Sequence, residues 1–267
     1  MDPLGWTVVY TLFAWWFSTG AILYLDGLPR HTFRHTMGWT TVLLGGALWG
    51  LVHTRGDTSA AGAYCAFTCA LLVWAWQEVA FLLGWVTGPR RAACPLGAQG
   101  ARRFGFALQA VLYHELALIV LAIAVWACVG DGANRTGWWT FLALWGMRQS
   151  AKLNVFLGVR NLGENFLPDH LAYLKTYFQR RPMNVLFPFS VTISTATAVA
   201  VWWSLLEAGS PHAGGAAVGL ALVGSLLALG ALEHWLLVLP LPTEALWRWG
   251  LRSHAAPAAE PPLTPPA

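Results

Sequence analysis

The chain has 267 residues, of which 57% are hydrophobic and only 10% are charged, and 17 of them are tryptophan. This composition excludes an ordinary soluble domain and predicts an integral membrane protein with one membrane-embedded domain, residues 1–250. The formal net charge of +4 does not indicate a nucleic-acid partner, because the basic residues lie in short loops between apolar segments. Residues 251–267 are rich in proline and alanine, and we expect them to form a disordered tail.

The apolar residues fall into seven runs along the chain, each long enough to cross the hydrocarbon core of a bilayer. Only helices satisfy the backbone in such runs, so the predicted fold is all-α, a polytopic membrane helix bundle of about seven transmembrane helices. The first run lacks the basic flank of a signal peptide, and we expect it to be retained as a span. The expected spans are residues 4–25, 37–54, 59–87, 104–129, 138–157, 187–208 and 215–242.

The loops between these spans differ sharply in positive charge. Twelve Lys and Arg residues lie in the loops after the first, third and fifth spans and in the segment after the seventh, whereas the opposite loops hold only Arg55 and Arg135. Basic residues concentrate on the cytoplasmic side of membrane proteins. This pattern predicts an N-terminus outside the cytoplasm and a cytoplasmic C-terminus.

The loop after the fifth span contains the segment "LPDHLAYLKTYFQRRPMN", which has helical periodicity. Pro168 suits the start of a helix, and Leu171, Leu174 and Phe178 recur on one face of it. The pattern predicts a short cytoplasmic amphipathic helix lying on the membrane surface. Its basic end would be attracted to anionic lipid headgroups, so membrane lipids are expected partners.

Several spans carry ionisable residues at compatible depths. His114 and Glu115 sit side by side in "ALQAVLYHELALIVLAIAVWACV", although a charge at such a depth costs about 2.5–3.5 kcal/mol to insert. An ionisable residue inside a span is by default a functional hypothesis. The residues concerned are Glu78, His114, Glu115, Arg148, Lys152, Glu233 and His234 within spans, with Glu164, Asp169 and His170 at the cytoplasmic boundary.

One interpretation of these residues is structural. Glu78, Glu115 and Glu233 would pair with Arg148 and Lys152, and the network would fix the arrangement of the helices without any ligand. In particular, we expect Glu115 to face the fifth span and pair with Arg148 or Lys152. Adjacent residues on a helix point about 100° apart. His114 is therefore expected to face a different site, shared with Glu78, Glu233 and His234.

A second interpretation is a metal site, because carboxylates and imidazoles are the ligands of carboxylate di-iron centres. Bundles of that kind normally carry Glu-x-x-His pairs, and this chain has none, so a bound metal ion is the weaker hypothesis. The candidate metal ligands are Glu78, Glu115, Glu164, His170, Glu233 and His234.

A third interpretation is a site for a tetrapyrrole, since a neutral histidine in an apolar bundle can ligate its central metal. A proton or solute pathway is disfavoured by the lack of an internal repeat. The candidate cofactor-binding residues are His114, His234, Glu78, Glu233 and His170.

Three stretches resemble a known family: "AWWFSTGAILYLDGLP" near the start, "NLGENFLPDHLAYLKTYFQRRPMNVLFP" in the centre and "LEHWLLVLPLPTEALWRW" near the end. They are similar to the PuhE family, photosynthetic complex assembly protein 2 of purple and related phototrophic bacteria. The resemblance covers nearly the whole chain and implies a multi-pass protein of the bacterial inner, photosynthetic membrane. Its expected partners are reaction-centre or antenna subunits.

The resemblance further implies an assembly factor for the photosynthetic apparatus, acting on the reaction centre and its antenna or on bacteriochlorophyll supply. The Glu/His site would then face the cytoplasm and hold bacteriochlorophyll, a precursor or a nascent subunit. The resemblance supplies no catalytic residues, so we favour an assembly function over an enzymatic one. The alternatives are a metal-dependent membrane enzyme acting on a tetrapyrrole or lipid, and a ligand-free scaffold subunit of a photosynthetic complex.

Overall fold

In the computed structural model, which describes residues 3–207 and 214–254, each expected apolar run forms one long helix. The described residues are all-helical apart from loops and one isolated bridge between Val159 and Arg180. The long helices are α1 (Pro3–Asp26), α2 (Phe33–Thr54), α3 (Ala60–Leu82), α4 (Gly100–Val129), α5 (Thr136–Leu157), α6 (Phe187–Glu207) and α7 (Gly215–Leu236). Short 3-10 helices join or follow them: η1 (Arg30–Thr32), η2 (Glu164–Phe166), η3 (Asp169–Tyr177), η4 (Thr243–Trp247) and η5 (Gly250–His254).

Five of these helices, α1, α3, α4, α6 and α7, are long and apolar enough to cross a membrane. The protein is therefore a multi-pass membrane protein by the length and composition of its helices. Helices α2 and α5 have 22 residues each, which is also sufficient length, but they carry more polar side chains. The expectation of seven spans is thus supported for five helices, and α2 and α5 are not among those that are both long and apolar enough.

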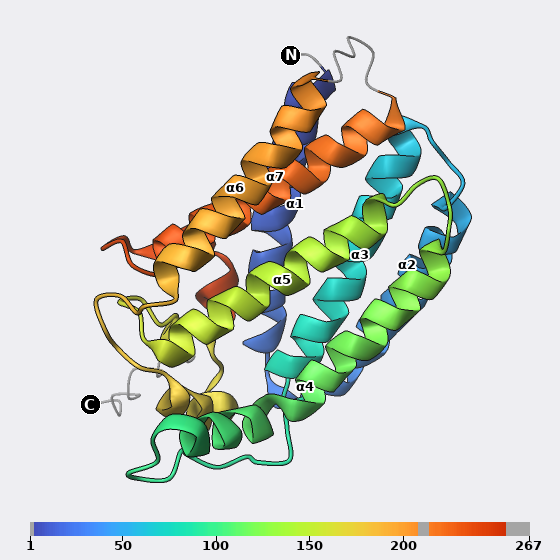
Figure 1. Cartoon of the computed structure of the whole chain (residues 1–267). Helices are drawn as coiled ribbons and strands as arrows, with labels where there is room; N and C mark the ends of the chain where they lie inside the picture. Colours follow the sequence, from blue (N-terminus) through green and yellow to red (C-terminus); the bar gives the residue numbers. More distant parts are fainter. Residues whose placement is uncertain (1–2, 208–213, 255–267) are drawn as a thin grey trace, which may run out of the picture.

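Helices α3 and α7 form the centre of the bundle. In α3, 67% of the most apolar stretch is buried, and in α7 72%, compared with 17% in α1 and 22% in α6. Helix α5 runs diagonally between the α2–α3–α4 group and the group of α1, α6 and α7, and it packs on both central helices (Figure 1). The outer helices expose many large apolar side chains, as expected of surfaces that contact lipid.

Helix α4 bends: its first part lies across one end of the bundle, and the rest runs beside α2 (Figure 1). The loop after α3 presses against it, since the amide of His114 donates to the carbonyl of Thr87 at 3.0 Å and the amide of Arg90 donates to that of Gln109 at 3.3 Å. A Cβ on Gly88 would collide with the Gln109 carbonyl oxygen. Glycine is therefore needed at position 88, and insertion of loop backbone accounts for the bend.

The segment expected to lie as an amphipathic α-helix on the membrane surface is instead the 3-10 helix η3, packed on the bundle. The three-residue repeat of a 3-10 helix puts Leu171, Leu174 and Tyr177 on one face, and all three are buried. Phe178, expected on that face, follows the end of the helix and is half-buried. The buried residues that η3 packs against are Phe81, Leu82 and Ala110.

The first residues of the expected disordered tail are helical. Helix η5 packs on the end of α1, where a Cβ on Gly250 would collide with the Gly20 carbonyl. The imidazole Nε2 of His254 lies 2.6 Å from a carboxylate oxygen of Asp26. The expectation of a tail from residue 251 is therefore wrong for residues 251–254, and the rest of it, residues 255–267, lies outside the described residues.

Candidate functional site

Helix α5 carries the sequence "RQSAKLN", residues 148–154, which we call the α5 polar segment. Successive residues of a helix project about 100° apart. Closely spaced polar residues on one helix therefore reach several neighbouring helices at once. In this structure the segment contacts polar side chains of α3, α4, α6 and α7.

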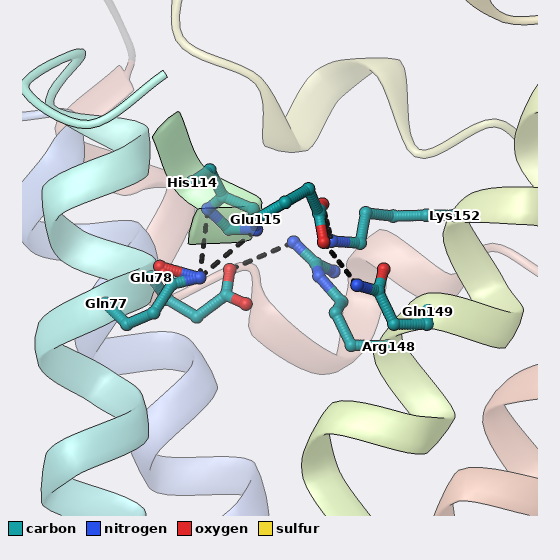
Figure 2. A network of polar contacts seen from close by, with 7 residues as sticks. All are labelled: Gln77, Glu78, His114, Glu115, Arg148, Gln149 and Lys152. Atoms are coloured by element: carbon teal, nitrogen blue, oxygen red, sulfur yellow. Dashed lines mark hydrogen bonds and ion pairs between the residues drawn. The ribbon is translucent and has the colours of Figure 1, made fainter. Parts of the chain in front are cut away.

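Arg148 connects the segment to α3. Its Nη2 donates to Oε2 of Glu78 over 2.9 Å (Figure 2). The Glu78 side chain is largely buried, whereas 42% of the Arg148 side chain is exposed. The ion pair thus connects a buried carboxylate on α3 to a guanidinium group that is partly exposed on the outer surface of the helix bundle.

Lys152 and Gln149 connect the segment to α4. Lys152 Nζ donates to Oε1 of Glu115 over 2.6 Å, and the amide of Gln149 donates to the other carboxylate oxygen (Figure 2). Positions 149 and 152 lie on one face of α5 because they are three residues apart. Both oxygens of Glu115 therefore have hydrogen-bond partners. Of the two cations expected as its partner, Arg148 and Lys152, Glu115 pairs with Lys152.

His114 points away from this pair, toward α3. The amide nitrogen of Gln77 lies 2.9 Å from its Nδ1 and 3.1 Å from its Nε2, and the centroid of the tilted Phe81 ring lies 4.4 Å from that of the imidazole. Because an amide N–H donates, the imidazole nitrogen accepts in its neutral form. The carbonyl oxygen of Gln77 and Oε1 of Glu78 are buried without a hydrogen-bond partner among the described residues, which leaves acceptor capacity beside the ring.

Helix α7 adds His234 and Glu233. The Nδ1 of His234 lies 2.7 Å from the Gly230 carbonyl and its Nε2 lies 2.8 Å from the Ser150 hydroxyl. A carbonyl only accepts, so Nδ1 carries the proton and Nε2 accepts from Ser150. Oε1 of Glu233 accepts from the Trp15 indole at 2.6 Å, which brings α1 into the network. The cations expected to pair with Glu233 are paired with Glu78 and Glu115 instead.

Asn154 ends the segment and fixes α6. Its amide donates to the Ser190 hydroxyl at 2.9 Å, and its carbonyl oxygen accepts from Asn184 at 3.0 Å. Asn184 also donates to the Gly158 carbonyl at 3.0 Å. These neutral polar groups satisfy the end of α5 where it meets the next loop.

Glu164 and His170 have partners of their own outside this network. Glu164 pairs with Arg180 at 3.1 Å on the exposed surface. The Nε2 of His170 bonds the Leu82 carbonyl at 2.8 Å, and burial lowers the pKa of this imidazole. The structure thus links Glu78, Glu115, Arg148, Lys152 and His234 through α5 and leaves these two residues at the end of the bundle.

The described residues contain no group of three or more side chains placed to hold a metal ion. The six candidate metal ligands therefore do not form one centre in this structure. The contacts that sequence reasoning missed come from neutral side chains: Gln77, Gln149, Ser150, Asn154 and Asn184. The first four lie inside helices, where a polar residue in an apolar run needs a partner within the protein, so the sequence could have indicated them. Asn184 lies in the loop before α6 and carries no such signal.

The comparisons with known proteins match nearly the whole chain. The family described as "Protein of unknown function (DUF3623)" matches residues 1–258. The chain belongs to the DUF3623 family. It is 42% identical over 266 residues, 96% of this chain and 95% of the relative, to the "Uncharacterized 30.4 kDa protein in puhA 5'region" of Rhodobacter capsulatus. No solved structure matches this chain.

Removing the carboxylate of Glu115 is expected to destabilise the fold. Glu115→Ala leaves Lys152 without its ion pair, a loss of about 3–5 kcal/mol for fully buried pairs and less here, because 27% of the Lys152 side chain is exposed. Glu115→Gln keeps the shape and one acceptor, so it should cost less. The free energy of unfolding in mild detergent measures both, and equal stability of Glu115→Ala and wild type would contradict the assignment.

Proposed function

We propose that this protein is an assembly factor for the bacterial photosynthetic apparatus, acting on a membrane-embedded reaction-centre or antenna subunit. Two observations support a photosynthetic role. The chain resembles the PuhE family along most of its length, and its relative in Rhodobacter capsulatus is named for its place in the puhA 5′ region. The identity of 42% extends over nearly the whole of both chains, which favours a shared role.

The observation that carries an assembly role is the partly exposed charge on the face between α4 and α5. The side chains of Arg148, Lys152 and Glu115 are 42%, 27% and 18% exposed, at positions inside helices that cross the membrane in this proposal. Charge facing lipid is costly, and charged groups inside spans normally face a bundle interior or a partner. A transmembrane helix of a client subunit, docked on this face with a polar group at the same depth, would remove that cost.

In an alternative form of the assembly role, the buried histidines would hold a tetrapyrrole, either bacteriochlorophyll or a precursor. This alternative requires a histidine nitrogen that is free to bind the central metal. One ring nitrogen of His114 accepts from Gln77, so the other carries the proton, and both nitrogens of His234 have partners. Axial ligation by either ring therefore requires one of these bonds to break. We therefore place docking of a protein subunit ahead of pigment holding.

The proposal includes seven spans in the bacterial inner membrane, with the N-terminus outside and the C-terminus in the cytoplasm. The polar groups that lower the hydropathy of α5 are paired with its neighbours in the bundle, so they do not prevent α5 from crossing. The asymmetry of basic residues between loops supports this orientation.

Reporter fusions test the orientation. An enzyme active only outside the cytoplasm should work when fused at Asp57 or Asp131, and it should be silent at Ala98 or after His254. Activity at the last two sites would reverse the assignment.

Site-specific cross-linking in a phototrophic host that carries this gene tests the docking face. A photo-reactive residue at Ile119, one helical turn beyond Glu115 and exposed, should capture a reaction-centre or antenna subunit. The matched control is Val199, also apolar and exposed on α6, and it should not. Deletion of the gene should also lower the near-infrared absorption of the membranes by reaction centre and antenna.

Two results would contradict this proposal, one for the assembly role and one for its docking face. The first is unchanged membrane absorption after deletion, together with no photosynthetic subunit cross-linked from Ile119. The second is equal capture of the same subunit from Ile119 and Val199, which would remove the α4–α5 face as the docking site.

A further inference from the structure

A pocket at one end of the bundle lies apart from the α5 polar segment. It has a volume of about 460 Å³ and is lined by residues of η1, the start of α2 and the loop after α3. Its lining residues are Arg30, His31, Phe33, Arg34 and Trp85. Two arginines, a histidine and two aromatic rings therefore meet in one open pocket, and no carboxylate is among these lining residues.

The positive charge of this pocket is not neutralised by the protein. Among the described residues, neither Arg30 nor Arg34 forms an ion pair with a carboxylate. Arg34 Nε makes one weak contact, at 3.3 Å, to the ring of His35. A third guanidinium, that of Arg91, donates to the Gly84 carbonyl directly beside Trp85. Unpaired guanidinium groups with planar donor forks suit a phosphate group.

The pocket lies where the membrane surface is expected. It is formed after the end of α1, at the start of α2 and just beyond the end of α3. Trp85 is 56% exposed, and exposed tryptophan is typical of the headgroup level of a bilayer. A ligand in this pocket would thus meet the arginines in the headgroup layer.

An apolar strip continues from the pocket along α2. Gly38 and Val42 follow Arg34 at intervals of four residues, so they lie on the same face of the helix. Both are exposed, and a Cβ on Gly38 would meet open space. Trp39 and Leu43 flank this strip and are also exposed. The surface below the arginines is therefore smooth and apolar, as an acyl chain requires.

We propose that this pocket binds the phosphate headgroup of an anionic phospholipid. Arg30 and Arg34 hold the phosphate, Trp85 lies at the glycerol level, and one acyl chain follows the Gly38–Val42 face of α2. The apolar strip selects a phospholipid over free phosphate, because a small anion would use the arginines alone. This site is independent of the assembly role, since no residue of the α4–α5 face takes part in it.

The test uses the full-length protein in nanodiscs made of equal amounts of phosphatidylglycerol and phosphatidylcholine with identical acyl chains. Native mass spectrometry after gentle release counts the lipids that remain bound. Wild type should retain phosphatidylglycerol, and Arg30→Gln with Arg34→Gln should reduce this retention at least tenfold. The control pair, Arg248→Gln with Arg252→Gln, removes the same charge from exposed positions outside the pocket and should retain the lipid.

A charge-neutral variant, Gly38→Leu, tests the acyl-chain part, because it fills the strip where the backbone has room for a side chain. It should weaken phosphatidylglycerol retention while the protein unfolds at the wild-type temperature. Three outcomes would overturn the proposal: equal retention by the Arg30/Arg34 variant and wild type, an equal loss in the control pair, or full competition by millimolar inorganic phosphate. Wild-type retention by Gly38→Leu would remove the acyl chain from the strip.

Discussion

A charged or strongly polar side chain inside a membrane span must find its partners within the protein, because hydrocarbon offers none. This constraint acts most strongly on helix α5, because five of the seven residues in its segment 148–154, RQSAKLN, are polar or charged. Its two cations pair with Glu78 and Glu115, and its neutral groups bond His234 and Ser190. The position of α5 between the two central helices follows from that requirement.

The same constraint explains the surroundings of His114. At the bend of α4 its backbone amide bonds the Thr87 carbonyl, and its ring accepts from Gln77. The loop after α3 therefore supplies backbone where the helix departs from regular geometry. This loop also leads to the basic end of the bundle, where Trp85 and the two unpaired arginines form the proposed headgroup pocket. The same connection between α3 and α4 thus contacts the bend of α4 through Thr87 and contributes Trp85 to the proposed membrane-surface site.

Apolar runs were sufficient to predict the long helices, because burial in lipid leaves the backbone no alternative to internal hydrogen bonds. Two of the three expected ion pairs were predictable, since Glu78, Glu115 and the two cations lie at similar depths. Glu233, also expected to pair with a cation, accepts from the Trp15 indole instead. The choice of Lys152 for Glu115 depends on the rotation and tilt of α5, which packing decides. The bend of α4 and the 3-10 geometry of η3 also escaped prediction. Both depend on segments distant in sequence, as the approach of Gly88 to Gln109 shows for the bend.

The claim that α5 is held by its charged partners is tested most directly by a double-mutant cycle on Glu78 and Arg148. The free energies of unfolding in mild detergent are compared for wild type, Glu78→Gln, Arg148→Gln and the double variant. If these partners hold α5 in place, the coupling energy between the two positions should be about 0.5–3 kcal/mol, as for residues in direct contact. Additive effects of the two substitutions, within about 0.3–0.5 kcal/mol, would contradict this claim.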